Sequence, residues 1–136
     1  NAQKVVNFLK KHEEVTKVIY ATEYEKAIAD RAKKYLNGGN GPMVGIELKG
    51  GMEAGKKFIE SLKMFYHVAN IGDARSLAIH PASTTHSQLN EKELAATGVT
   101  QSYIRLCIGL EHIDDIIDDL EQALNKSSKV TLKAVS

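Results

Sequence analysis

Arg105 is the residue of this sequence whose type and position most clearly call for chemistry. It lies in the middle of the run 103–110, Tyr-Ile-Arg-Leu-Cys-Ile-Gly-Leu, which is otherwise apolar and short enough to form one strand. A guanidinium cannot give up its charge, so a buried one needs an anionic partner or costs several kcal/mol. The strand itself contains no acidic residue. We therefore expect a carboxylate or phosphate from outside the strand to bind Arg105.

The polar segment 79–87 is the second candidate, because it gathers side chains that form hydrogen bonds. It contains His80, His86 and three consecutive hydroxyl residues at 83–85. Composition alone also fits an ordinary surface loop, together with an Arg105 that is paired to an Asp or Glu elsewhere in the fold. At this level the two interpretations are equally good.

Three other kinds of site are disfavoured by residue type or spacing. The five histidines are scattered, and no Cys or His pair has the spacing of a zinc site. Cys107 should share a face with Arg105, but a single cysteine in a strand is most often a small buried hydrophobic residue. The glycine-rich segments 37–41 and 50–51 match neither phosphate-loop pattern and are typical of helix ends.

Composition indicates one globular domain. The chain has 136 residues, 43% of them hydrophobic, with 18 basic and 17 acidic residues. This balance gives no reason to expect nucleic acid or an anionic membrane as a partner. No apolar run approaches the roughly 20 residues that cross a bilayer, and the single cysteine weakly favours a cytoplasmic location. The start at Asn1, without methionine, suggests a piece of a longer protein.

Hydrophobic spacing and turn residues predict alternating helices and strands. The expected helices cover the first dozen residues, 22–36, 51–62, 91–96 and 113–124, and the expected strands are 15–21, 43–49, 66–71, 76–79 and 103–110. In the second helix, Thr22 and Glu25 form a capping box. Its expected buried stripe is Ala27, Ile28, Arg31, Ala32, Tyr35 and Leu36.

The expected architecture depends on the last helix with its tail and on the segment 66–79. We expect the last helix to turn four aspartates outward, at 114, 115, 118 and 119, and the tail 126–136 to be loosely held, with a further edge strand at 130–132 as an alternative. The segment 66–79 reads as a hairpin, which argues against a purely parallel sheet. The prediction is an α+β fold, a small mostly antiparallel sheet with helices packed on one face.

Two segments resemble a known family. The run 69–86, Ala-Asn-Ile-Gly-Asp-Ala-Arg-Ser-Leu-Ala-Ile-His-Pro-Ala-Ser-Thr-Thr-His, resembles the C-terminal region of the Cys/Met-metabolism family of pyridoxal 5'-phosphate (PLP) enzymes, and 103–120 resembles that family's closing signature. The segments 50–58 and 70–73 are most similar to its sulfhydrylase branch. The resemblance extends roughly from Thr16 to Leu124, and it implies the C-terminal small domain of a fold-type I PLP enzyme.

The resemblance also implies roles for three residues. Arg105 would bind the α-carboxylate of an amino-acid substrate, and Asn70 would touch the same carboxylate, at a position where many lyase relatives carry serine. Thr85 would hold the arginine through its hydroxyl. No metal site is implied.

What the resemblance places elsewhere matters as much. The family's Schiff-base lysine belongs to a Ser-x-Thr-Lys type motif, and no such motif occurs in this sequence. We therefore expect no catalytic residue in residues 1–136, no PLP bound to them alone, and a PLP-binding large domain upstream. The fragment alone would be inactive, and the full-length enzyme would form a homotetramer.

The implied reaction is a γ-replacement of cytoplasmic methionine biosynthesis, which makes homocysteine or methionine from O-acetylhomoserine and sulfide or a thiol. The alternatives are a γ-synthase or γ-lyase of the same family, with O-succinylhomoserine or cystathionine chemistry, and a freestanding amino-acid-binding module. Each of these would take a small amino acid as its partner.

Overall fold

The structure is a computed structural model that describes the backbone of residues 1–134 and their side chains, except those of residues 91, 95 and 129–134. Its helices are α1 (Ala2–Leu9), α2 (Lys26–Tyr35), α3 (Gly51–Ser61), the short 3-10 turn η1 (Pro81–Ser83), α4 (Glu91–Ala96) and α5 (Ile113–Ala134). Its strands are β1 (Val15–Ile19), β2 (Met43–Leu48), β3 (Tyr66–His67), β4 (Leu77–Ile79) and β5 (Tyr103–Cys107).

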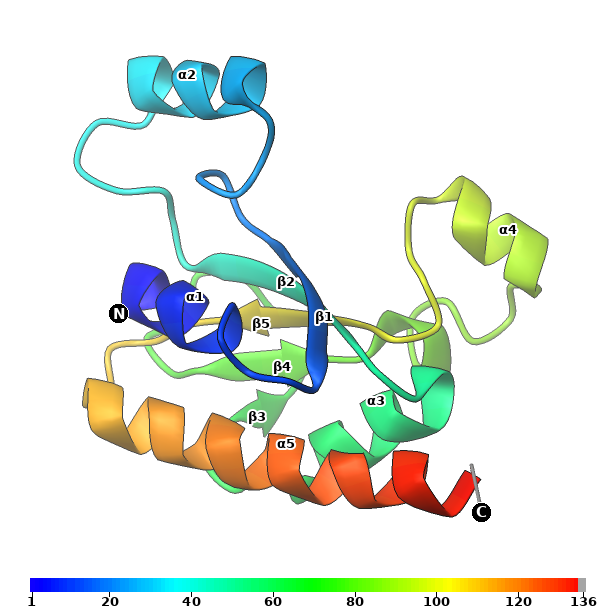
Figure 1. Cartoon of the computed structure of the whole chain (residues 1–136). Coiled ribbons are helices and arrows are strands. Elements are labelled where there is room, and N and C mark those ends of the chain that lie inside the picture. The colour runs from blue at the N-terminus through cyan, green and yellow to red at the C-terminus, as the bar shows by residue number, and fades with distance from the viewer. Residues whose placement is uncertain (135–136) are drawn as a thin grey trace.

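The strands form one sheet in the order β1-β2-β5-β4-β3, and every pair except β3–β4 is antiparallel. Helices α1, α3 and α5 cover one face of this sheet, whereas α2 stands apart from it on two connecting segments (Figure 1). The predicted α+β architecture, with a mostly antiparallel sheet and helices on one face, is confirmed.

Alternation along the strands sorts the side chains between the two faces. The core lies between the sheet and the three helices, and it contains Val5, Val6, Leu9, Val44, Ile46, Leu48, Phe58, Ile104, Leu106, Ile116, Leu120 and Leu124, all nearly inaccessible to solvent. Because Ile104 and Leu106 face this core, Arg105 must face the other side of the sheet.

The predicted hairpin at 66–79 is wrong. β3 and β4 pair in parallel, through Tyr66 with Leu77 and His67 with Ala78. Parallel neighbours require the chain to return to the end where it began. Residues 68–76, hereafter the return loop, make that journey, and they bring Asn70 to β5.

The predicted N-terminus and buried stripe of α2 are also wrong. The helix begins at Lys26 with no side-chain cap, and the Thr22 hydroxyl donates to the neighbouring Glu23 carboxylate instead. Of the expected stripe only Ala32 is buried, while Tyr35 is 67% exposed. The apolar spacing is real, but the chain places the helix away from the core.

The last helix differs from expectation at two points. Its backbone is helical through Ala134, so no edge strand forms at 130–132. Asp119, expected outside, is only 6% exposed. Its carboxylate accepts hydrogen bonds from the backbone N–H groups of Lys63, Met64 and Phe65, at 2.9, 2.8 and 3.3 Å. It thereby holds the segment that connects α3 to β3.

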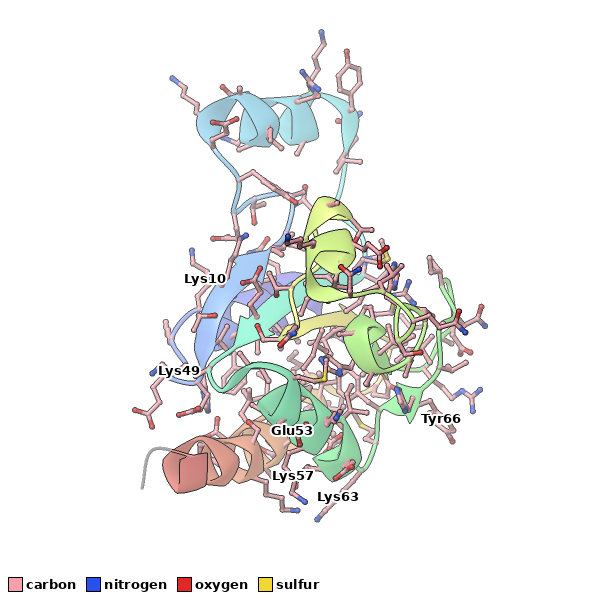
Figure 2. All side chains as sticks on the ribbon, turned by 90° about the vertical axis from the view of Figure 1, so that its right-hand side faces the viewer. Lys10, Lys49, Glu53, Lys57, Lys63 and Tyr66 are labelled. Carbon is pink, nitrogen blue, oxygen red and sulfur yellow. The ribbon has the colours of Figure 1, made fainter. Side chains whose placement is uncertain are left out.

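Charged side chains of both signs lie on the outside of the molecule. Figure 2 shows Lys49, Lys57 and Lys63 on the surface, and Glu53 on α3 lies 2.9 Å from Lys56. Exposed pairs of this kind contribute little to stability. Among the described residues, no helix is long and apolar enough to span a bilayer.

Asp119→Asn should lower the free energy of unfolding by about 1.5–3 kcal/mol, because three backbone donors lose a charged acceptor. Urea denaturation of the variant measures this change. Asp118→Asn is the matched control, since Asp118 is exposed on the same helix and its replacement should have almost no effect. Equal stability of the two variants would contradict this account of Asp119.

Candidate functional site

Arg105 lies at the centre of the sheet face that α1, α3 and α5 leave uncovered. The strand register places Ile19, Gly45, Arg105 and Ile79 in one row across four strands. Tyr103 and Cys107 flank Arg105 on its own strand and share its face. The sequence prediction that Arg105 occupies a strand among apolar residues is therefore confirmed.

The Arg105 guanidinium is only partly satisfied. Its Nη2 donates to the backbone carbonyl of Asn70 at 3.2 Å. Its Nε is shielded from solvent and has no hydrogen-bond partner, and no described acidic residue forms an ion pair with Arg105. The alternative of an Arg105 paired to an Asp or Glu is thus ruled out within the described residues. The remaining donors form a planar fork that matches a carboxylate.

A pocket of about 530 Å³ lies beside Arg105, between α2 and the ends of β1 and β2. Apolar and aromatic side chains line most of it, among them Tyr24, Ile28 and Met43. Arg31 and Arg105 are its charged lining residues, and none of the described acidic residues contributes to the lining. The pocket therefore suits an anion whose remaining part is uncharged.

Gly45 shapes the wall of this pocket. A Cβ at this position would lie 2.7 Å from Cε2 and 2.9 Å from the hydroxyl of Tyr103, so the tyrosine ring lies against the glycine backbone next to Arg105. Sequence analysis missed both residues. A glycine inside a strand is the signal that could have found them, because it often marks such a close approach.

Asn70 is brought to Arg105, but through its main chain. The exposed residue presents its carbonyl oxygen to the guanidinium and, at 3.9 Å, to the thiol of Cys107. The expected contact of its side-chain amide with a substrate stays a prediction.

Thr85 is exposed, and its hydroxyl lies 2.8 Å from Nδ1 of His86. The hydrogen bond described for Arg105 goes to Asn70 and not to Thr85. The expected role of Thr85 in holding the arginine stays a prediction.

His80 serves the fold. The fully buried ring has Nε2 at 2.7 Å from the Gln101 carbonyl oxygen and Nδ1 at 2.8 Å from the Ser83 hydroxyl. Since a carbonyl only accepts, Nε2 donates to Gln101, and in the neutral ring Nδ1 accepts from Ser83. Burial lowers the pKa of His80, with the bond to Gln101 opposing the change. Gly55 leaves room for the ring.

Cys107 behaves as the small buried residue that its position in the strand predicts. It is 5% exposed, and burial raises the pKa of its thiol even though the nearby charge of Arg105 acts in the opposite direction. A nucleophilic thiolate is therefore disfavoured. The described residues also contain no cluster of metal-ligating side chains.

The sequence matches one family over almost its whole length. A family model described as "Cys/Met metabolism PLP-dependent enzyme" matches residues 1–125. The O-acetyl-L-homoserine sulfhydrylase of Leptospira meyeri is 52% identical over 125 residues, which cover 91% of this chain and 28% of that enzyme.

Solved structures share the fold as well. A protein from Campylobacter jejuni, described as an O-acetylhomoserine (thiol)-lyase and carrying a pyridoxyl-lysine phosphate, has a TM-score of 0.82 and 43% identity over 91% of this chain and 30% of that one. The cystathionine gamma synthase of Xanthomonas oryzae has a TM-score of 0.81 and 29% identity over 95% and 33%. The chain thus spans about a third or less of these relatives.

His80→Gln should flatten the pH dependence of stability. Because the folded ring has a lowered pKa, the unfolded chain binds more protons below about pH 6.5, and the wild type should lose stability as the pH falls through that value. Urea denaturation between pH 7 and 5 measures the slope. His112→Gln, at an exposed position, is the control and should keep the wild-type slope. An unchanged slope in His80→Gln would contradict the burial effect.

Proposed function

The chain belongs to the Cys/Met metabolism family of PLP-dependent enzymes, and on that premise we propose that it is the C-terminal, substrate-binding part of an O-acetylhomoserine sulfhydrylase. The observation that carries the proposal is the guanidinium of Arg105, which has no acidic partner among the described residues and lies beside a pocket with no acidic residue in its described lining. An amino-acid carboxylate would supply the missing anion.

Arg105 binds the α-carboxylate in this proposal. Its fork of N–H groups donates to both carboxylate oxygens at once, which fixes the direction of the carboxylate and so of the Cα that must lose a proton. The Asn70 carbonyl accepts from Nη2 of Arg105, and the remaining N–H groups of the two Nη atoms donate to the substrate carboxylate. The Asn70 amide touches the same carboxylate, and Thr85 supports the arginine when the site is complete.

The cofactor is held elsewhere in the complete enzyme. PLP supplies the electron sink for removal of the Cα proton when it is bound. Arg105 is a partly buried cation with no described acidic partner, and it fits the carboxylate of an amino acid that reacts with PLP. The residues present therefore suit a neighbouring PLP site. The lysine that holds PLP lies outside residues 1–136, and these residues alone are inactive.

The rest of the enzyme covers the open side of this domain. Residues 1–136 form its C-terminal substrate-carboxylate-binding domain, and the PLP-binding large domain is a further part of the polypeptide. The length of the relatives supports this, as do the exposed apolar side chains in and next to α2: Tyr35, at the end of the helix, is 67% exposed, and Tyr24 and Leu36, which flank it, are 47% and 44% exposed. The complete protein is a cytoplasmic homotetramer.

The reaction is a γ-replacement, in which acetate leaves O-acetylhomoserine and sulfide or a thiol takes its place, giving homocysteine or methionine. The apolar walls of the pocket by Tyr103 and Met43 suit an uncharged substrate side chain. A γ-synthase or γ-lyase remains the second candidate, because the cystathionine gamma synthase fold matches almost as well. The higher identity to a sulfhydrylase favours the first.

In the complete enzyme, Arg105→Ala should lower kcat/KM for O-acetylhomoserine, and the loss should correspond to about 2–4 kcal/mol of transition-state stabilisation, since a charged bidentate contact is lost. Steady-state kinetics with each substrate varied in turn measure this, and the KM for sulfide should change far less. Lys57→Ala is the control, because Lys57 is exposed on α3 and lines no part of the pocket. A loss below about tenfold for Arg105→Ala would count against the assignment.

The isolated 136-residue chain should bind no PLP at a specific site. Absorbance after mixing with PLP and exhaustive dialysis should show no retained cofactor, whereas the complete enzyme keeps it. Stoichiometric retention by the isolated chain would place the cofactor site in this domain and refute the proposed division of roles.

A further inference from the structure

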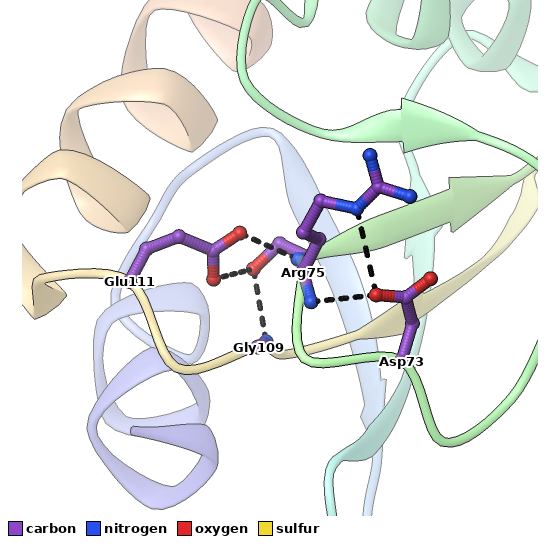
Figure 3. A network of polar contacts seen from close by, with 5 residues as sticks. Asp73, Arg75, Gly109 and Glu111 are labelled. Atoms are coloured by element: carbon purple, nitrogen blue, oxygen red, sulfur yellow. Dashed lines mark hydrogen bonds and ion pairs between the residues drawn. The ribbon is translucent and has the colours of Figure 1, made fainter.

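Glu111, just beyond β5, binds the C-terminal end of the return loop at Ser76. Its carboxylate accepts the backbone N–H of Ser76 at 2.6 Å and the Ser76 hydroxyl at 2.9 Å (Figure 3). Ser76 is completely buried. A charged acceptor with two short bonds to one buried residue is a strong local restraint.

The main chain at the end of β5 reinforces this grip. The N–H of Gly109 donates to the Ser76 hydroxyl at 2.9 Å, and the N–H of Leu110 donates to the Ala74 carbonyl at 2.8 Å. A Cβ on Gly109 would lie 2.5 Å from the Ala74 oxygen, so only glycine allows this approach. The segments 74–76 and 109–111 are thus held in direct contact.

The near end of the same loop meets the carboxylate site. The Asn70 carbonyl accepts a hydrogen bond from Nη2 of Arg105, which lies in the middle of β5. Between the two ends, Asp73 accepts the backbone N–H of Arg75 at 3.0 Å and stiffens the turn. The return loop therefore bridges Glu111 at one end of β5 and Arg105 in its middle.

From this geometry we infer that Glu111 is a positioning residue for the Arg105 site. By holding Ser76 it fixes the return loop, and the loop's Asn70 carbonyl fixes the plane of the guanidinium that receives the substrate carboxylate. The inference deepens the proposed function and rests on it. Bidentate binding demands a fixed plane, so a loosened loop should weaken binding of the amino acid without touching the other substrate.

Asp119 offers a matched control, because it is the same kind of group in another place. It too is a partly enclosed carboxylate that accepts backbone N–H groups of a connecting segment, at residues 63–65. It has no contact with the return loop among its described hydrogen bonds. A purely structural role for Glu111 predicts that both residues behave alike.

The test compares Glu111→Gln with Asp119→Asn in the complete enzyme. Glu111→Gln should lower kcat/KM for O-acetylhomoserine about tenfold, as expected for a misoriented contact, and leave the KM for sulfide within about twofold. Asp119→Asn should destabilise the enzyme and leave both values within about twofold. Equal kinetic effects of the two variants overturn the inference.

A double-mutant cycle shows whether Glu111 acts through the arginine. In an Arg105→Ala background, Glu111→Gln should change kcat/KM by less than about twofold, because the group it positions is gone. Independent, multiplying losses overturn the inference. Should Glu111→Gln fail to fold, Ser76→Ala replaces it, since this change removes the hydroxyl's bonds to Glu111 and Gly109 and keeps the bond from the Ser76 backbone N–H to Glu111. It should give a smaller loss in the same direction, and no loss at all overturns the inference.

A readout without catalysis separates this inference from the proposed function. The ¹⁵N–¹H resonance of Arg105 Nε should shift in Glu111→Gln and stay in place in Asp119→Asn. An unmoved resonance in Glu111→Gln overturns the positioning role. A moved resonance together with an Arg105→Ala variant of normal kinetics upholds the linkage and refutes the proposed function alone.

Discussion

A guanidinium keeps its charge wherever the fold places it, so the position of Arg105 constrains everything around it. β5 must have its apolar residues on the helix side and its arginine on the open side. That open face supplies a carbonyl from Asn70 but no described acidic partner. A domain built only for stability would gain by pairing or replacing such a cation. The energetic cost of leaving Arg105 without an acidic partner is offset when an anionic ligand binds to it.

The topology serves this site through an unusual connection. Because β3 and β4 are parallel neighbours in an otherwise antiparallel sheet, the chain between them must run back along the edge. That return loop delivers the Asn70 carbonyl to Arg105 and is fastened by Glu111 at its other end. A two-residue hairpin, which the sequence suggests at 66–79, would have offered no such loop. Connection and site therefore belong together.

Local sequence patterns correctly predicted features that depend on neighbouring residues, such as the face of a strand on which a side chain lies. They failed for contacts between segments that are distant in the sequence. Alternation in 103–107 placed Arg105 opposite Ile104 and Leu106, and this is confirmed. The spacing of aspartates on the last helix could not reveal that Asp119 meets the backbone of residues 63–65. Nor could the apolar stripe of α2 show that the helix stands away from the core, with only Ala32 buried. Asn70 was assigned by resemblance through its side chain, yet its carbonyl makes the described contact.

A crystal structure of the complete enzyme with bound amino acid tests the central claim most directly. The account predicts that both carboxylate oxygens lie about 2.7–2.9 Å from nitrogens of the Arg105 guanidinium. A carboxylate bound elsewhere, or an Arg105 that pairs with an acidic side chain of the remaining polypeptide, would contradict it.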